Sequence, residues 1–323
     1  MQHPKLYLAP LNTLGNLAFR ELCFNHGADF VFSEMIRTEK LLKGSICEIK
    51  KSNIQYFLED KTIIQIISQE NINDIEEAIQ LIIKINPKIK EINYNMGCPQ
   101  SSLCKNNNGA GILKDLSKIE IIATLLKKSC DKYNLIPSIK TRIGIDRDKI
   151  IIKKVVSILE KIGINKIYIH GRVLRESYNK PATYKEIKEL KTYFPNIQII
   201  ANGDVCDINS FNNINKTKPD GIMIGRAALE NPQIFNILKN NIDIKNQNKS
   251  GITFLEKKAI ILEYLKYAHL YDLNISTIKS NLSYLTKNII NGSNLRQKIN
   301  QINNVKKLIE FIKIYKNHDK KLE

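Results

Sequence analysis

Short strand-like runs alternate with amphipathic helical stretches over the first 230 residues, and this repetition restricts the fold more than any other feature. Eight such runs occur, at residues 5–9, 29–33, 62–67, 89–95, 137–141, 166–170, 198–201 and 221–224. Between most of them the apolar residues recur at helical spacing, as at 75–85, 116–127 and 151–162. Eight strand–helix units predict a TIM (β/α)8 barrel, an α/β fold, with an open doubly wound parallel sheet as the alternative.

The C-terminal part of the chain follows a different pattern. Residues 239–251 are polar and predict a linker, and residues 252–323 have helical apolar spacing throughout. We therefore expect a barrel at 1–238 and a small helical bundle domain at 252–323. Residues 240–323 hold 15 basic and seven acidic side chains, a net +8 of the +18 carried by the whole chain. A solvated bundle explains such charge, and so does a surface that binds a polyanionic partner.

Composition excludes several classes of protein. The six cysteines are scattered without metal-type spacing, so the sequence predicts neither a metal site nor a disulfide framework. The N-terminus lacks the apolar core of a signal peptide, and no stretch of about 18 apolar residues occurs. We expect a cytoplasmic protein with no membrane partner, and nothing indicates an obligate protein partner.

Distinctive residues, most of them polar or ionisable, stand at the ends of nearly all the predicted strands. They are Pro10, Ser33, Glu34, Gln65, Asn95, Cys98, Lys140, Arg142, His170, Arg172, Asn202, Gly203, Asp204, Gly225 and Arg226. Because the carboxyl ends of all barrel strands meet at one face, these residues predict a single ligand pocket. One of them alone, such as His170, would more often be a core histidine, so the prediction depends on their convergence.

The last two strand ends indicate a phosphate ligand. Asn202-Gly203 and Gly225-Arg226 supply glycines with free backbone N–H groups, and the loops after strands seven and eight are the usual phosphate site of this barrel. Only eight of the 50 basic residues are arginine, and the planar fork of Arg226 suits a phosphate. Turn geometry alone is the alternative reason for these glycines.

The sequence Asn95-Met96-Gly97-Cys98-Pro99, named the Cys98 turn below, follows the fourth predicted strand. A glycine permits a sharp turn, and a proline stops the strand from continuing its hydrogen-bonded ladder. The thiol is thereby held at the carboxyl end of a buried strand. By itself the motif is also compatible with a small apolar residue in a tight corner.

Together these motifs resemble those of the tRNA-dihydrouridine synthases, in order and spacing. The segments that carry the resemblance are LAPLNTLGNLAFREL, FVFSEM, NYNMGCPQ, NNNGAGIL, SIKTRIG, IYIHGR, IIANGDV and DGIMIGRAALENPQIF. The resemblance implies an FMN enzyme that reduces the C5=C6 bond of selected uridines in tRNA, with NADPH or NADH recharging the flavin. Hydride would reach C6 from the flavin, and a proton would reach C5 from the opposite side of the ring.

The resemblance also implies roles for individual residues. Cys98 would be the general acid, since a thiol with a pKa near ~8.5 is protonated at neutral pH yet releases its proton readily. Lys140 and His170 match positions that contact the flavin ring, where a cation stabilises the anionic reduced form. The other implied flavin-binding residues are Pro10, Gln65 and Asn95 around the ring and Asn202, Gly203, Gly225 and Arg226 at the phosphate.

Five further residues are implied to face the substrate. Arg142 and Arg172 would face the RNA or the flipped base, and Lys279, Lys287 and Arg296 are candidate RNA contacts. The sequence departs from the usual pattern after His170-Gly171-Arg172, where an arginine is displaced to Arg175 and Glu176 stands in place of Gln. These departures leave the target uridine open, and no motif identifies a nicotinamide site.

Two other functions stay open at this point. A flavin enzyme that acts on free pyrimidines would share the barrel but gain nothing from a basic helical domain. An RNA-binding protein that has lost catalysis would be expected to carry a damaged Cys98 turn or flavin site, whereas both motifs are intact here.

Overall fold

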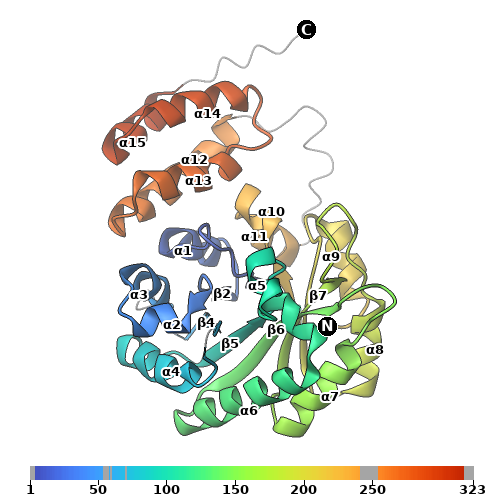
Figure 1. The fold of residues 1–323 in the computed structure, drawn as a ribbon. Helices are drawn as coiled ribbons and strands as arrows, with labels where there is room; N and C mark the ends of the chain where they lie inside the picture. The colour runs from blue at the N-terminus through green and yellow to red at the C-terminus, as the bar shows by residue number, and fades with distance from the viewer. Residues whose placement is uncertain (1–3, 54–57, 59, 70, 241–253, 316–323) are drawn as a thin grey trace.

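The structure is a computed structural model that describes residues 4–53, 58, 60–69, 71–240 and 254–315 (Figure 1). Apart from its first two residues, the predicted linker at 239–251 lies outside this described part of the chain. Within the described residues, no helix combines the length and the apolar character needed to cross a bilayer.

Eight parallel strands form a closed ring. The sheet contains β1 (Lys5–Leu8), β2 (Phe30–Phe32), β3 (Ile36–Arg37), β4 (Thr62–Ile67), β5 (Glu91–Met96), β6 (Ile136–Gly144), β7 (Lys166–Val173), β8 (Gln198–Asn202) and β9 (Gly221–Ile224). β1 pairs with both β2 and β9, and β2 pairs with β4, so the sheet has no free edge. The two-residue β3 is an addition beside β4. The predicted barrel is confirmed, and the open doubly wound sheet is excluded.

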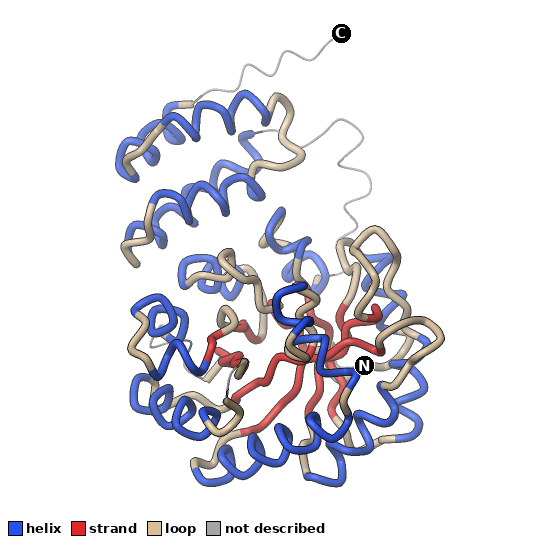
Figure 2. Tube along the Cα trace, in the orientation of Figure 1, coloured by secondary structure: helices blue, strands red, loops and turns tan. Residues whose placement is uncertain are grey.

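Helices surround the ring (Figure 2). They are α1 (Leu17–Asn25), α2 (Thr38–Leu42), α3 (Ile46–Ser52), α4 (Asp74–Ile85), α5 (Ser101–Lys105), the 3-10 helix Gly109–Lys114, α6 (Leu116–Lys132), α7 (Ile152–Ile162), α8 (Lys185–Tyr193), α9 (Ile208–Asn215), α10 (Arg226–Glu230) and α11 (Ile234–Lys239). In α7 the buried residues Ile152, Val155, Val156 and Leu159 recur at helical spacing. Gly163 caps the C-terminal end of the helix, and its φ of 86° suits a residue without a side chain.

Two strands extend further than their sequence pattern indicates. β6 continues to Gly144 and β7 continues to Val173, three residues beyond each predicted end. The ladder between them persists through a register shift between Arg142 and Gly144. Arg142 and Arg172 therefore lie inside strands, where the sequence placed them just past strand ends.

The barrel interior is divided into an apolar part and a polar part. Tyr7, Phe32, Ile63, Ile200 and Met223 form one buried apolar cluster together with Tyr168. The polar part is made by inward-facing residues of the neighbouring strands β4 to β7, which lead up to the carboxyl face.

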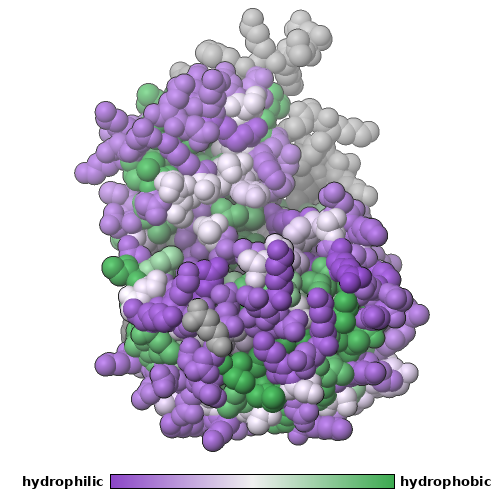
Figure 3. All heavy atoms as spheres, in the orientation of Figure 1, coloured by the Kyte–Doolittle hydropathy of each residue, from purple (hydrophilic) through white to green (hydrophobic). Residues whose placement is uncertain are grey.

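Four helices follow the barrel: α12 (Phe254–Leu270), α13 (Ile275–Leu285), α14 (Gly292–Gln301) and α15 (Val305–Ile314). This confirms the helical character expected of the C-terminal region. α12 packs on α1, and α13 packs on α10 (Figure 1). Between the N-cap of α1 and α13, the buried Asn281 accepts a hydrogen bond from Nδ2 of Asn16 at 2.9 Å. The face of the bundle seen in Figure 3 is mostly hydrophilic.

Candidate active site

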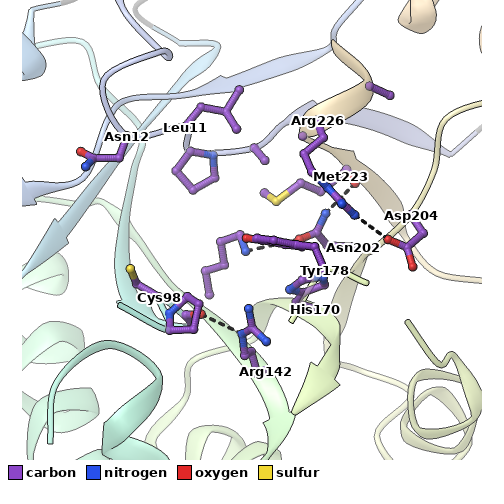
Figure 4. Close-up of a pocket in the computed structure, with 18 of the residues that line it drawn as sticks. Leu11, Asn12, Cys98, Arg142, His170, Tyr178, Asn202, Asp204, Met223 and Arg226 are labelled. Atoms are coloured by element: carbon purple, nitrogen blue, oxygen red, sulfur yellow. Dashed lines mark hydrogen bonds and ion pairs between the residues drawn. The ribbon is translucent and has the colours of Figure 1, made fainter. Parts of the chain in front are cut away.

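A cavity of about 640 Å³ opens at the carboxyl ends of the strands (Figure 4). All nine residues predicted to bind the cofactor line it, together with Cys98, Arg142 and Lys287: Pro10, Gln65, Asn95, Lys140, His170, Asn202, Gly203, Gly225 and Arg226. Arg172, Lys279 and Arg296 do not line it. The convergence predicted from the strand ends is therefore present, because alternate residues of neighbouring parallel strands point to the same side of the ring.

The Cys98 turn is held by main-chain and side-chain hydrogen bonds. Oδ1 of Asn95 accepts the backbone N–H groups of Gly97 and Cys98, each at 3.0 Å. The carbonyl of Cys98 accepts the N–H of Ala110 at 2.8 Å. Gly109 packs so closely here that a Cβ on it would lie 2.6 Å from the same carbonyl oxygen. The half-buried thiol is thus carried by a turn that is fixed on both sides.

Lys140 and His170 give the pocket floor its electrostatic character. Burial and the nearby charge of Arg142 lower the pKa of Lys140 to about 8. Asn202 donates to the carbonyl of Met223 at 2.9 Å, which turns its Oδ1 toward Nζ of Lys140 at 3.4 Å. Within the described part of the chain, Oδ1 of Asn202 is the hydrogen-bond acceptor of the Lys140 ammonium.

Burial and four surrounding cations hold the pKa of His170 well below its usual value. Nη1 of Arg172 lies 3.0 Å from Nε2 of His170. Because a guanidinium can only donate, Nε2 is the acceptor and the single ring proton is on Nδ1. The imidazole is therefore a neutral hydrogen-bonding group of the pocket.

Asp204 joins two arginines beside the pocket. Its carboxylate accepts Nη2 of Arg172 at 2.6 and 2.7 Å and Nη2 of Arg226 at 2.7 Å. Partial burial raises the pKa of Asp204, but the hydrogen bonds from Arg172 and from the Ala182 N–H, together with the charges of the two arginines, hold it below its usual value. The guanidinium of Arg226 also lies 4.4 Å from the ring centroid of Tyr178. Figure 4 shows this group on the opposite side of the pocket from Cys98.

Arg142 and Arg172 are buried and make their hydrogen bonds within the protein, and of the two Arg142 lines the pocket. Both side chains are about 1% exposed. Arg142 donates from Nε to the carbonyl of Gly97 at 3.1 Å and from Nη1 to the carbonyl of Val173 at 2.8 Å. The guanidinium groups of Arg142 and Arg172 bind main-chain carbonyls, and that of Arg172 also binds Asp204. Arg142 thereby ties the Cys98 turn to the end of β7.

The three basic residues predicted in the bundle differ in position. Lys287 is 46% exposed, lines the pocket and forms an ion pair with Glu230 at 3.0 Å. Lys279 donates to the carbonyl of Asn300, and Arg296 donates to the carbonyl of Thr286, both within the bundle. The structure thus brings Lys287 to the pocket and leaves Lys279 and Arg296 away from it.

Sequence reasoning assigned no role to three residues that shape the site. Tyr178 packs near His170, with ring centroids 6.1 Å apart, and against Arg226. Tyr184 donates from its hydroxyl to the carbonyl of Gly203 at 2.7 Å. The displaced Glu176 binds Arg147 through two contacts of 2.6 Å. All three follow the His170-Gly171-Arg172 motif closely in the sequence, and this proximity is the feature from which a role at the site could have been predicted.

The pocket combines three chemical functions. A thiol is held on one wall, a cation with a lowered pKa stands on the floor, and an arginine lies on the opposite wall beside two glycines. Gly203 has a φ of 140°, and a Cβ there would lie 2.6 Å from Ala182. Such an arrangement can hold a flat ring with an anionic edge, bind a phosphate and deliver a proton.

The sequence of this chain is similar to one protein family along nearly its whole length. The family model described as dihydrouridine synthase (Dus) matches residues 7–319. A probable tRNA-dihydrouridine synthase of Helicobacter pylori is 29% identical over 97% of this chain and 92% of its own. Another from Aquifex aeolicus is 28% identical over 95% of each chain.

Other similarities are more distant. tRNA-dihydrouridine synthase B of Pasteurella multocida is 27% identical over 82% of this chain and 77% of its own. The solved structure of TcOYE with pHBA covers 74% of this chain and 89% of that chain with a TM-score of 0.54, at 9% identity, which indicates a shared fold. Because the family model spans almost the whole sequence, the chain belongs to the dihydrouridine synthase (Dus) family.

Proposed function

We propose that this protein is an FMN-dependent tRNA-dihydrouridine synthase that reduces the C5=C6 bond of specific uridines in tRNA, with NADPH or NADH as the reductant. The observation that carries the proposal is that Cys98 lines the same pocket as Lys140 and Arg226. Relatives matched along nearly the whole chain are named tRNA-dihydrouridine synthases, which supports the same substrate.

The residues of the pocket fit FMN. Lys140 is a half-buried cation whose hydrogen bond to Asn202 is long, at 3.4 Å, so an anionic ring edge would be a better acceptor. Arg226, Gly203 and Gly225 together would hold the phosphate. Gly225 lines the pocket directly before Arg226, where the backbone carries no side chain.

Each protein group has a defined task in this proposal. Bound FMN would supply the hydride to C6 and would be recharged by NADPH or NADH. Cys98 would hold the proton at Sγ and give it to C5 as negative charge develops there. Lys140 would offset negative charge at the ring edge that it faces. Asn95 would keep the thiol in place through the backbone N–H of Cys98.

The helical bundle would bind the RNA. Lys287 extends the basic character of the bundle to the pocket rim, and the region carries a large share of the net positive charge. A uridine has to leave its stack to reach a pocket at the carboxyl ends of the strands, and contacts to the RNA backbone beside the pocket would hold it there.

Incubation with NADPH and tRNA lacking modified bases tests the proposal. The purified protein should carry a flavin absorbance spectrum, and mass analysis of the RNA should detect dihydrouridine. Reduction of free uracil or uridine with no product in tRNA would overturn it in favour of an enzyme for free pyrimidines. A protein without flavin affinity and without product would favour the RNA-binding alternative.

A further inference from the structure

A chain of buried polar side chains runs through the barrel interior from its amino-terminal end to the pocket. It consists of Glu91, Ser138, Asn93, Gln65 and Asn95, and it is named the polar column here. Each member is 6% exposed or less. Such barrels are filled mainly by branched apolar side chains, so a continuous polar path requires a physical reason.

The lower end of the column has a fixed direction. Oε2 of Glu91 accepts Nζ of Lys166 at 2.6 Å, and Oε1 accepts the Tyr168 hydroxyl at 2.8 Å. The Lys166 ammonium lies 5.5 to 5.6 Å from three aromatic ring centroids, those of Tyr7, Phe30 and Tyr168. Burial and the charge of Glu91 hold the pKa of Tyr168 well above its usual value, so its hydroxyl remains a donor. Glu91 is thus a fixed acceptor.

Hydrogen-bond counting then orients each amide in turn. Ser138 donates its one proton to Glu91 at 2.6 Å, so it accepts from Nδ2 of Asn93 at 2.9 Å. Oδ1 of Asn93 accepts Nε2 of Gln65 at 2.9 Å, and Oε1 of Gln65 accepts Nδ2 of Asn95 at 2.8 Å. Each amide can satisfy both neighbours in one orientation only.

The upper end of the column is the Cys98 turn. With Nδ2 of Asn95 directed at Gln65, its Oδ1 is left for the backbone N–H groups of Gly97 and Cys98. A reversed Asn95 amide would place N–H groups against these two donors. The two backbone N–H groups and the direction set at Glu91 thus require the same orientation of the Asn95 amide, and the column supports the turn in that orientation.

We propose that Glu91, Ser138 and Asn93 are positioning residues that orient the Asn95 amide and thereby fix the Cys98 turn from the far end of the barrel. Their effect on uridine reduction rests on the proposed function, whereas their effect on the turn does not. Ser138 and Asn93 contribute no atoms to the pocket lining. They act through Gln65 and Asn95.

Hydrogen exchange of the Gly97 and Cys98 amides in the full-length protein tests this inference without reference to activity. Ser138→Ala and Asn93→Leu each interrupt the column, so the Asn95 amide loses part of the support that holds its Oδ1 on the two N–H groups, and these groups lose their acceptor part of the time. One such bond corresponds to about a five- to tenfold rise in exchange. If Ser138→Ala does not fold, Asn93→Leu makes the same test.

Tyr168→Phe is the matched control, because it removes a buried hydroxyl from the same oxygen of Glu91 but leaves the column continuous. It should leave exchange at Gly97 and Cys98 within about twofold of the wild type, since no hydrogen bond of the column is lost. Exchange in β9 should be unchanged in all variants. Unchanged protection in both interrupted variants, or an equal rise in Tyr168→Phe or in β9, would overturn the proposal.

Discussion

Asp204 and Arg226 form an ion pair at the pocket wall, with Nη2 of the arginine donating to Oδ1 of the aspartate at 2.7 Å. The same carboxylate is also bound by the buried Arg172. Asp204 therefore shares one negative charge between two cations. Arg226 is half-exposed and has five N–H donors, so a ligand phosphate can bind it while this ion pair holds its direction.

Replacing Arg226 by Ala should weaken FMN binding at least about tenfold, because a charge-assisted hydrogen bond contributes roughly 1.5–3 kcal/mol. Titration of the flavin-free protein with FMN measures the affinity. Arg175→Ala is the control, since Arg175 is 70% exposed and pairs with Asp146 outside the pocket. Equal FMN affinity in Arg226→Ala and the wild type would remove Arg226 from the phosphate site.

The affinity for reduced FMN, whose ring edge is anionic, should fall as the pH rises through about 8. Lys140 in the ligand-free pocket has a pKa of about 8, so above that pH it is neutral and no longer attracts an anionic ring edge. Each further unit should weaken the charge-dependent part of binding by up to about tenfold. Dissociation constants at pH 7 to 9.5 measure this, and Lys140→Met should lose the dependence.

Lys185→Met is the matched control for that titration, because Lys185 is 82% exposed and lies outside the pocket. It should keep the wild-type pH profile. A wild-type affinity that stays constant over this pH range would show that the Lys140 charge does not contribute to binding.

Arg142→Met should lower the free energy of unfolding by roughly 3 kcal/mol, because it leaves buried carbonyls without their charged donor. Urea denaturation of the two proteins measures the difference. Arg147→Met removes a partly exposed ion pair with Glu176 and should cost less than about 1 kcal/mol. If Arg142→Met keeps wild-type stability and only weakens tRNA binding, the original assignment to the RNA is correct.

Lys287→Met should weaken tRNA binding and reduce the slope of log affinity against log salt concentration by about 1, as expected for one lost phosphate contact. Binding at several salt concentrations measures the slope. Lys154→Met, on the exposed face of α7, should leave the slope unchanged. An identical slope in Lys287→Met and the wild type would exclude a phosphate contact at the pocket rim.

The barrel could be predicted from the sequence because its eight strands and their helices each have a local hydrophobic period. The extension of β6 and β7 could not, because it depends on a ladder between two segments far apart in the chain. The pocket could be predicted because all strand ends meet at one face. Arg142 could not be placed, since its carbonyl partners come from other elements.

The interior of β5 illustrates the same limit. Residues 89–95 are recognisable as a buried strand, and Glu91, Asn93 and Asn95 fall at alternate positions that share one side of it. That period is visible in the sequence. Their partners Ser138, Lys166 and Gln65 lie in three other strands, so their hydrogen bonds required the structure.

The central claim is that the Cys98 thiol supplies the proton in uridine reduction, and Cys98→Ala tests it most directly. Dihydrouridine formed in tRNA by the flavin-loaded protein with NADPH is measured by mass analysis, with Cys47→Ala, an exposed cysteine outside the pocket, as the control. We predict that Cys98→Ala keeps its bound flavin and loses at least about 100-fold in rate, in keeping with the loss of a general acid. A rate equal to that of the Cys47→Ala control would contradict the claim.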